Sequence, residues 1–298
     1  MGLRHLGRLA AWTFVYVAAT QLALLVLTRL ATTVGQFPQY NIAYQVWQLP
    51  YAVVAVSVIT ALLPRMSRHA AQERLDLMRS DLDRGLRLSA MLLIPAALGL
   101  LVLGQQVAVA LFAHGQTTYA QAEHIGSVLA VFGLGLLPFS IYQVQSRAFY
   151  AVGDTKTPAL VQVFVSTAMV LVDLTLSALL PAHARIYGLA AGLVAANCLG
   201  AIVTTTLVRR RFGSSRATGT QTDPASQRTM TGALTRMTFA GLVGAATAVA
   251  AAAILAPVLP TGWTGAAFVV TLAGVTDLVI YWAVLRLLGV GEARKATL

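Results

Sequence analysis

Eight long apolar segments limit what this chain can fold into. Each has about 20 or more mostly apolar residues, the length that an α-helix needs to cross the hydrocarbon of a bilayer. They cover residues 9–34, 40–63, 86–112, 125–150, 159–181, 186–208, 232–256 and 264–288. Because lipid offers the backbone no hydrogen-bond partner, such segments span a membrane as helices. We therefore predict an all-α, polytopic membrane protein with eight transmembrane helices.

Composition excludes a water-soluble globular protein. Hydrophobic residues make up 57% of the chain and charged residues 10%, whereas soluble proteins carry roughly a quarter charged residues. The one cysteine, Cys198, lies in an apolar segment and supports neither an internal disulfide nor a multi-cysteine metal site. We recognise no nucleophile–base pair and no metal-ligand spacing. The sequence therefore predicts neither an enzyme nor a bound metal or cofactor.

The distribution of positive charge gives the orientation. When the lysines and arginines are placed against the eight segments, all but Arg29 and Arg185 lie on the same side of the membrane. Arg29 lies inside the first segment, and Arg185 lies on the opposite side. Basic residues gather on the cytoplasmic side of membrane proteins, so we predict that both termini are cytoplasmic. The formal charge of +11 thus reflects topology, and we expect no nucleic-acid partner.

One polar stretch divides the chain. Residues 209–231 are rich in Ser, Thr, Gly and Arg and are predicted to form a cytoplasmic linker. They separate a six-helix transporter lobe, residues 1–208, from a terminal two-helix pair, residues 232–298. A second charged run, residues 64–87, has apolar residues at helical intervals and is predicted to be an amphipathic helix on the cytoplasmic face.

The stretch from Pro138 to Pro158 contains the most specific sequence motif in the chain. It reads PFSIYQVQSRAFYAVGDTKTP, and its RAFYA and DTKTP parts resemble a segment of the MurJ/MviN-type lipid II flippases. That family belongs to the multidrug/oligosaccharidyl-lipid/polysaccharide flippase superfamily. Two further segments resemble the family: residues 60–67, TALLPRMS, and residues 111–115, LFAHG. The resemblance in sequence covers residues 6–210. The last two segments agree with the family only in the number and order of their spans.

The resemblance implies a transporter. Family members have two six-helix lobes and a final helix pair that extends a groove for the lipid tail. The chain then corresponds to the second lobe with the terminal pair, and the first six-helix lobe is missing. The implied function is to move lipid II, or a similar polyprenyl-pyrophosphate saccharide, from the cytoplasmic to the outer face of the bacterial plasma (inner) membrane by alternating access. Its partners would be that lipid, the membrane lipids and the first lobe.

Polar and ionisable residues within membrane spans are the candidate sites. The candidates for a substrate cavity are Arg29, Asn41, Gln45, Gln48 and Arg147. The candidates for a cytoplasmic gate are Asp154 and Lys156, and those for coupling to a cation or proton are Asp173 and Asp277. Structural roles stay open for them: a polar helix start around Gln45 with Trp47 at the interface, a helix end around Asp154, and neutral or hydrogen-bonded carboxyls for the two membrane aspartates.

The chain departs from the family pattern in two places. Members commonly carry a cavity arginine where this chain has Gln45, and we hypothesise that Arg29 supplies that charge; snorkelling of Arg29 to the outer interface is the alternative. Some members bind sodium with an acid where this chain has Leu27 and an asparagine where it has Met169. Because only Asp173 matches a ligand, sodium coupling is doubtful, and coupling to a proton or another monovalent cation stays open.

Two other functions remain open from the sequence. One is export of another polyprenyl-linked saccharide or of a drug cation by a relative in the same superfamily. Several cations in the cavity would favour a pyrophosphate, whereas acids with aromatic residues would favour a drug. The other is a membrane interaction fragment that does not transport.

Overall fold

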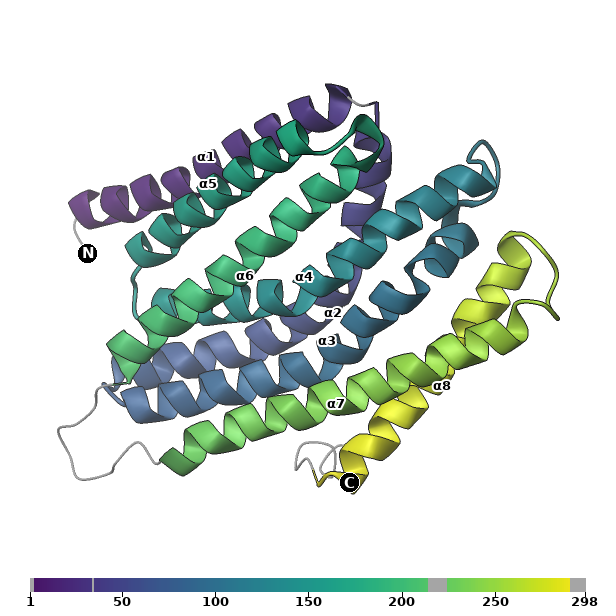
Figure 1. Ribbon diagram of the computed structural model, residues 1–298. Helices are drawn as coiled ribbons and strands as arrows, with labels where there is room; N and C mark the ends of the chain where they lie inside the picture. Colours follow the sequence, from purple (N-terminus) through teal and green to yellow (C-terminus); the bar gives the residue numbers. More distant parts are fainter. Residues whose placement is uncertain (1–2, 34, 214–223, 290–298) are drawn as a thin grey trace. The chain divides into compact units, whose positions relative to one another are not determined.

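The computed structural model describes residues 3–33, 35–213 and 224–289, and these residues form helices joined by short turns (Figure 1). The helices in chain order are α1 (Leu3–Thr33), α2 (Phe37–Ala71), α3 (Leu75–Phe112), α4 (Tyr119–Ala151), α5 (Lys156–Leu179), the short 3-10 helix η1 (Ala182–Ala184), α6 (Arg185–Phe212), α7 (Pro224–Leu255) and α8 (Trp263–Leu287). The predicted all-α class is confirmed.

The predicted number of spans also agrees with the structure. Within the described residues, seven helices are long and apolar enough to cross a membrane. The second predicted span counts as the eighth when Phe37–Val54 and Ser57–Ala71 of α2 are taken as one broken span. The break follows Val54. The orientation of the termini stays a prediction.

The prediction of one amphipathic helix over residues 64–87 is wrong. The run is split by a turn, with α2 ending at Ala71 and α3 beginning at Leu75. Glu73 has a left-handed φ of 58°, and the amide of Arg74 donates to the carbonyl of His69 at 2.9 Å, which is a Schellman ending. The charged run is therefore the tip of a helical hairpin, and the apolar spacing within it does not reveal the turn because both arms are helical.

The predicted linker over residues 209–231 lies partly outside the described residues. Its first residues continue α6 to Phe212, and its last residues belong to α7, which begins at Pro224. Residues 214–223 lie between the two described parts. The division into a lobe and a terminal pair stays a prediction.

By packing, the chain forms two compact units, each described here by itself. The first comprises Met1–Phe37, Ala55–Leu86 and Pro138–Thr222. The second comprises Pro38–Val54, Arg87–Leu137 and Asp223–Leu298. Helices α2, α3 and α4 thus contribute one segment to each unit.

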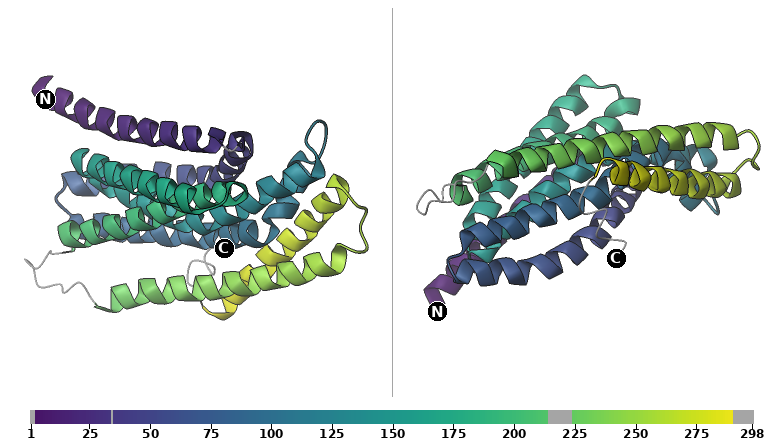
Figure 2. Two further views of the ribbon diagram at one scale, coloured as in Figure 1. Left: turned by 45° about the horizontal axis from the view of Figure 1, so that its top comes forward. Right: turned by 90° about the horizontal axis from the view of Figure 1, so that it is seen from below.

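In the first unit α5 packs against both α1 and α6 (Figures 1 and 2). Small residues of α6 allow this approach, as the spacing of Gly188 and Gly192 predicts. A Cβ on Gly188 would lie 3.1 Å from the Cβ of Leu176 on α5, and one on Gly200 would lie 2.9 Å from Val165. Helices α5 and α6 can therefore approach closely because α6 has glycines at the contact positions.

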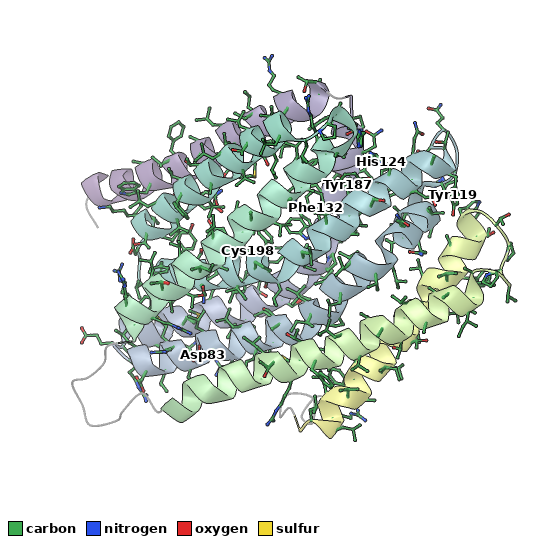
Figure 3. The ribbon with its side chains drawn as sticks, in the orientation of Figure 1. Asp83, Tyr119, His124, Phe132, Tyr187 and Cys198 are labelled. Atoms are coloured by element: carbon green, nitrogen blue, oxygen red, sulfur yellow. The ribbon has the colours of Figure 1, made fainter. Side chains whose placement is uncertain are left out.

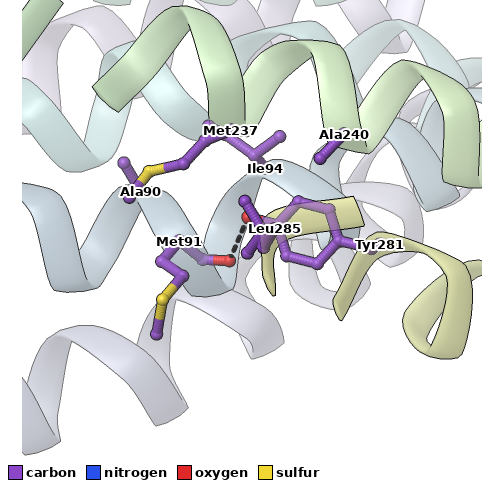
Figure 4. Packing of buried hydrophobic residues seen from close by; sticks show 7 residues of the cluster. All are labelled: Ala90, Met91, Ile94, Met237, Ala240, Tyr281 and Leu285. Atoms are coloured by element: carbon purple, nitrogen blue, oxygen red, sulfur yellow. Dashed lines mark hydrogen bonds between the residues drawn. The ribbon is translucent and has the colours of Figure 1, made fainter. Parts of the chain in front are cut away.

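In the second unit α3, α7 and α8 share an apolar core. Buried side chains from all three helices meet in one cluster, shown in Figure 4: Ala90, Met91, Ile94, Met237, Ala240, Tyr281 and Leu285. The hydroxyl of Tyr281 donates to the carbonyl of Met91 at 2.7 Å, so the one polar atom of that side chain is satisfied inside the cluster.

The backbones of α3 and α4 approach closely within the second unit. A Cβ on Gly104 would lie 2.8 Å from the carbonyl oxygen of Gly126, and one on Gly133 would lie 2.8 Å from the carbonyl oxygen of Ala97. Gln105 of α3 also donates to Ser127 of α4 at 2.9 Å. Packing of bare backbone, with one polar cross-link, is how helices associate where no hydrophobic effect acts between them.

We expect the Gly126→Ala substitution to destabilise the protein. The new methyl would overlap the Cα of Gln105 and lie 2.6 Å from the carbonyl oxygen of Gly104, both of which are backbone atoms that cannot rotate away. Overpacking of this kind costs about 1–3 kcal/mol. The free energy of unfolding in detergent micelles measures it. The control is Gly274→Ala on α8, where a Cβ meets no atom within 4 Å. Equal stability of the two variants would contradict this account of α3–α4 packing.

Candidate functional site

The turn between α4 and α5 has the geometry that its sequence predicts. Gly153 has a φ of 73°, which is unstrained only for glycine. The amide of Gly153 donates to the carbonyl of Tyr150 at 3.0 Å, and the amide of Asp154 donates to that of Phe149 at 2.9 Å. This Schellman ending stops α4 and turns the chain directly into α5.

Asp154 joins this turn to two helices. Its Oδ1 accepts from the amide of Thr157 at 3.0 Å, and its Oδ2 accepts from the Thr157 hydroxyl at 2.7 Å, so it caps the start of α5. The guanidinium of Arg211, in the last turn of α6, pairs with the same Oδ2. Partial burial alone raises the pKa of Asp154. The Thr157 hydrogen bonds and the Arg211 charge outweigh it and hold the pKa below its usual value.

The two other ionisable candidates of this segment are not paired with Asp154. The guanidinium of Arg147 is half-buried and lies 5.8 Å from the ring centroid of Tyr150, and its Nε has no hydrogen-bond partner among the described residues. The ammonium of Lys156 is exposed and lies 5.7 Å from the ring of Trp12 on α1. Cation–π contacts leave the positive charge of both groups uncancelled.

Buried hydrogen bonds join α4 to its neighbours in the first unit. The hydroxyl of Tyr142 donates to Gln162 of α5 at 2.6 Å, and Gln162 donates to Ser166 at 3.1 Å. The Thr204 hydroxyl of α6 donates to Gln145 of α4 at 2.7 Å. Gln145, Gln162 and Thr204 were not among the candidate residues that the sequence predicted. The four-residue spacing of Gln162 and Ser166 on an apolar helix is the signal that could have found the α5 partner.

Asp173 on α5 is the most enclosed ionisable residue of the first unit. It has no exposed surface, and neither carboxyl oxygen has a hydrogen-bond partner within the described ranges. Its Oδ1 occupies the space that a Cβ on Gly192 of α6 would need. Leu27, which stands where some family members have an acid, is buried on α1. An unpaired, buried carboxyl can take up a proton or a cation.

The polar candidates of α2 share one face. Asn41, Gln45 and Gln48 are spaced four and three residues apart, and Gln45 is exposed while the other two are half-buried. A different face of the helix packs in the second unit, where the ring of Trp47 lies 5.8 Å from that of Phe132, labelled in Figure 3. Trp47 is thus buried and is not an interface residue. The polar face is left free of this apolar packing.

Arg29 and Gln45 belong to different units. Arg29 is exposed on α1 in the first unit, and Gln45 is exposed on α2 in the second. The hypothesis that Arg29 supplies the charge that relatives place at the Gln45 position therefore stays a prediction.

The described part of the second unit contains a cavity and a groove. A cavity of about 690 Å³ lies between α3, α4 and the α7–α8 loop, with Gln105, Gln106, Glu123 and Tyr119 (labelled in Figure 3) among its lining. The second, termed here the α3–α8 groove, has a volume of about 520 Å³. The groove is lined by Met91, Leu92, Pro95, Leu278, Val279, Tyr281, Trp282, Ala283 and Arg286.

Comparison with known proteins decides the family. A family model described as "Lipid II flippase MurJ" matches residues 1–274. The chain belongs to the MurJ family. Members are bacterial inner-membrane proteins, so the predicted multi-pass location is confirmed. A flippase moves a lipid, and the family is therefore one of transporters.

Individual relatives agree with this assignment. A protein of Rhizobium meliloti described as "Probable lipid II flippase MurJ" is 33% identical over 140 residues, which cover 47% of this chain and 26% of the relative. The "Lipid II flippase MurJ" of Burkholderia cenocepacia is 30% identical over 157 residues, which cover 52% of this chain and 30% of the relative.

A solved structure shares the fold. The "Lipid II flippase MurJ, inward closed conformation" superposes with a TM-score of 0.70 at 18% identity, over 92% of this chain and 53% of that chain. The chain thus spans about half the length of the solved MurJ protein that it matches.

We expect two substitutions of Asp154 to separate its roles. Asp154→Ala removes both the helix cap and the ion pair, and loss of a cap alone costs about 0.5–2 kcal/mol of unfolding free energy. Asp154→Asn keeps a capping oxygen and removes only the charge, so its loss should be smaller. Chemical unfolding in detergent at neutral pH compares the two, and equal losses would mean that the ion pair dominates.

The same experiment has a pH dependence of defined sign. Because the pKa of Asp154 is lower in the folded protein, its stabilisation is present above the pKa of the unfolded chain, about 3.9. It is lost as the pH falls through the folded-state pKa. The stability difference between wild type and Asp154→Asn should therefore shrink on acidification below that value.

Proposed function

We propose that the chain contributes the second lobe and the terminal helix pair of a lipid II flippase. The observation that carries this proposal is the match of the MurJ family model to residues 1–274. Lipid II would enter from the cytoplasmic face and leave at the outer face. No bond is made or broken in that step, so we propose a transport function without catalysis.

Uncancelled cations support a pyrophosphate as the recognised group. Arg147 is half-buried with a free Nε donor, and an arginine fork matches two phosphate oxygens at once. Lys156, which is exposed, adds a second positive charge at the same helix junction. We propose that these two residues meet the pyrophosphate on entry, while Asp154, tied to Arg211, holds the turn that presents them.

The α3–α8 groove supports an apolar tail as the second recognised group. Its lining is aliphatic and aromatic except for Arg286 at the end of α8. A polyprenyl chain gains about 0.8 kcal/mol for each CH₂ group that leaves water, but within lipid the gain comes from shape and packing alone. The groove therefore suits guidance of the tail, with Arg286 close enough to one end to attract an anionic headgroup.

The polar face of α2 supports a cavity that faces the other half of a flippase. Asn41, Gln45 and Gln48 are held by a helix whose other face is fixed by aromatic packing. The chain covers 53% of the solved flippase, so we propose that it acts together with a first six-helix lobe. Rocking of two lobes about a central site is the expected mode of alternating access.

Asp173 is the proposed coupling residue of this lobe. It is buried, has no partner within the described ranges and rests against Gly192. We propose that it takes a proton or a monovalent cation. Sodium is the weaker candidate because Leu27 and Met169 supply no oxygen ligand from their side chains.

Two alternatives differ in the substrate and in the class of function. Another polyprenyl-linked saccharide would use the same cations and groove, whereas a drug cation would be repelled by Arg147 and Lys156. A membrane interaction fragment would need none of these residues for its role. Direct measurement of flipping distinguishes all three.

We expect the chain to support flipping only together with a first lobe. In cells depleted of their own lipid II flippase, co-expression of this chain with the six-helix first lobe of a MurJ protein should restore growth, because a cavity between two lobes needs both. The Arg147→Gln variant should fail at normal protein level, and Arg29→Gln tests the same role for Arg29. Rescue by residues 1–298 alone would contradict the two-lobe proposal.

We expect the α2–α3 turn to be cytoplasmic and the α7–α8 loop to be outside. With Cys198 replaced by alanine, single cysteines at Glu73 and Thr261 can be treated with a membrane-impermeant maleimide on intact cells. Glu73→Cys should react only after the membrane is opened, and Thr261→Cys should react at once. The reverse pattern would overturn the charge-based topology.

A further inference from the structure

Asp277 is a second enclosed carboxyl, and it lies in the second unit. It lies in the middle of α8, whose described residues carry no other acid, and only 3% of its surface is exposed. Its Oδ1 is buried and has no hydrogen-bond partner in the described part of the chain. Such a group in an apolar helix needs a physical reason to be there.

Glycines of two neighbouring helices lie against this carboxyl. A Cβ on Gly244 of α7 would overlap Oδ1 of Asp277 and lie 2.9 Å from its carbonyl oxygen. A Cβ on Gly99 of α3 would lie 3.7 Å from Oδ2. The carboxyl is therefore seated between glycines of α3 and α7, and one of those glycines is required for it to fit.

Among the described residues of the packed helices, no charged side chain lies close to this site between Gly99 and Gly244. The charged residues closest to it along the packed helices are Arg87 on α3, Arg236 on α7 and Arg286 on α8. Each lies at least two helical turns away along its helix, about 12 Å or more. The titratable neighbour on its own helix is Tyr281, whose hydroxyl already donates to the carbonyl of Met91 (Figure 4).

We propose that Asp277 is a proton-binding site of the α3–α7–α8 unit. A buried carboxylate without a counter-ion is strongly disfavoured, so the group is neutralised by a bound positive species. A proton needs a single oxygen, whereas a bare metal cation needs several. The positions that face the carboxyl from α3 and α7 are Gly99 and Gly244, which bring no side-chain oxygen to it. The seat thus suits a proton better than a sodium or potassium ion.

The proposal does not rest on lipid flipping. It follows from the second unit alone and is distinct from Asp173, which lies in the first unit. Its failure would leave the proposed function untouched, and failure of the flipping experiment would leave the proton site untouched.

Carbodiimide labelling tests the proposal on the full chain in vesicles of phosphatidylethanolamine and phosphatidylglycerol. Dicyclohexylcarbodiimide enters apolar surroundings and reacts with protonated carboxyls, and mass spectrometry locates the adduct. We expect modification of Asp277 at neutral pH, loss of that modification as the pH is raised, and no protection by sodium or potassium. In Asp277→Asn the adduct on this peptide should disappear while the thermal unfolding temperature is kept.

Matched glycine variants test whether the contacts of Gly99 and Gly244 with the Asp277 carboxyl matter for proton binding. Gly244→Ala places a methyl on Oδ1 and should shift the pH at which labelling is lost, whereas Gly99→Ala adds only an ordinary contact and should not. The infrared C=O band of a protonated carboxyl, lost in Asp277→Asn, gives a second readout that needs no reagent. Protection by an alkali cation would overturn the proton assignment, and a carboxylate band with no labelling at neutral pH would overturn the site.

Discussion

In the hydrocarbon of a bilayer, a peptide N–H or C=O finds no partner except another peptide group. Every described span of this chain meets that constraint as a helix. Two helices end abruptly at Glu73 and Gly153, because both residues adopt left-handed φ values at Schellman endings. The loops are short because they only reverse the chain.

The same constraint reaches the side chains. Tyr142, Gln162 and Ser166 satisfy one another across α4 and α5, and Tyr281 uses a backbone carbonyl. Helices come close where one lacks a Cβ, as at Gly104 and Gly126. Asp173 and Asp277 are exceptions. Each has a carboxyl oxygen close to a glycine of a neighbouring helix and without a donor among the described residues, and for this reason we propose a proton or a cation at Asp173 and a proton at Asp277.

The sequence was sufficient for the helical class, the number of spans and the family, because hydrophobic length and the RAFYA and DTKTP wording are local signals. The α4–α5 turn was predictable from Gly153 and Asp154 for the same reason. The hairpin within residues 64–87 was not, since Glu73 is an unusual residue for a left-handed position and its helical neighbours keep the apolar spacing. The partners of Gln145 and the glycine seats of the aspartates depend on the register of helices far apart in sequence, which spacing within one helix cannot give.

The sharing of α2, α3 and α4 between the two units bears on how the chain is assembled in the membrane. The second unit combines Pro38–Val54, near the start of the chain, with Asp223–Leu298, at the end. During synthesis, the early helices of that unit are therefore made before α7 and α8, and their packing stays incomplete until those two helices are present. Gly99 and Gly244 lack their contacts with Asp277 until α8 has been made. Packing of the described part of the second unit around that carboxyl can therefore be completed only after α8 has been made.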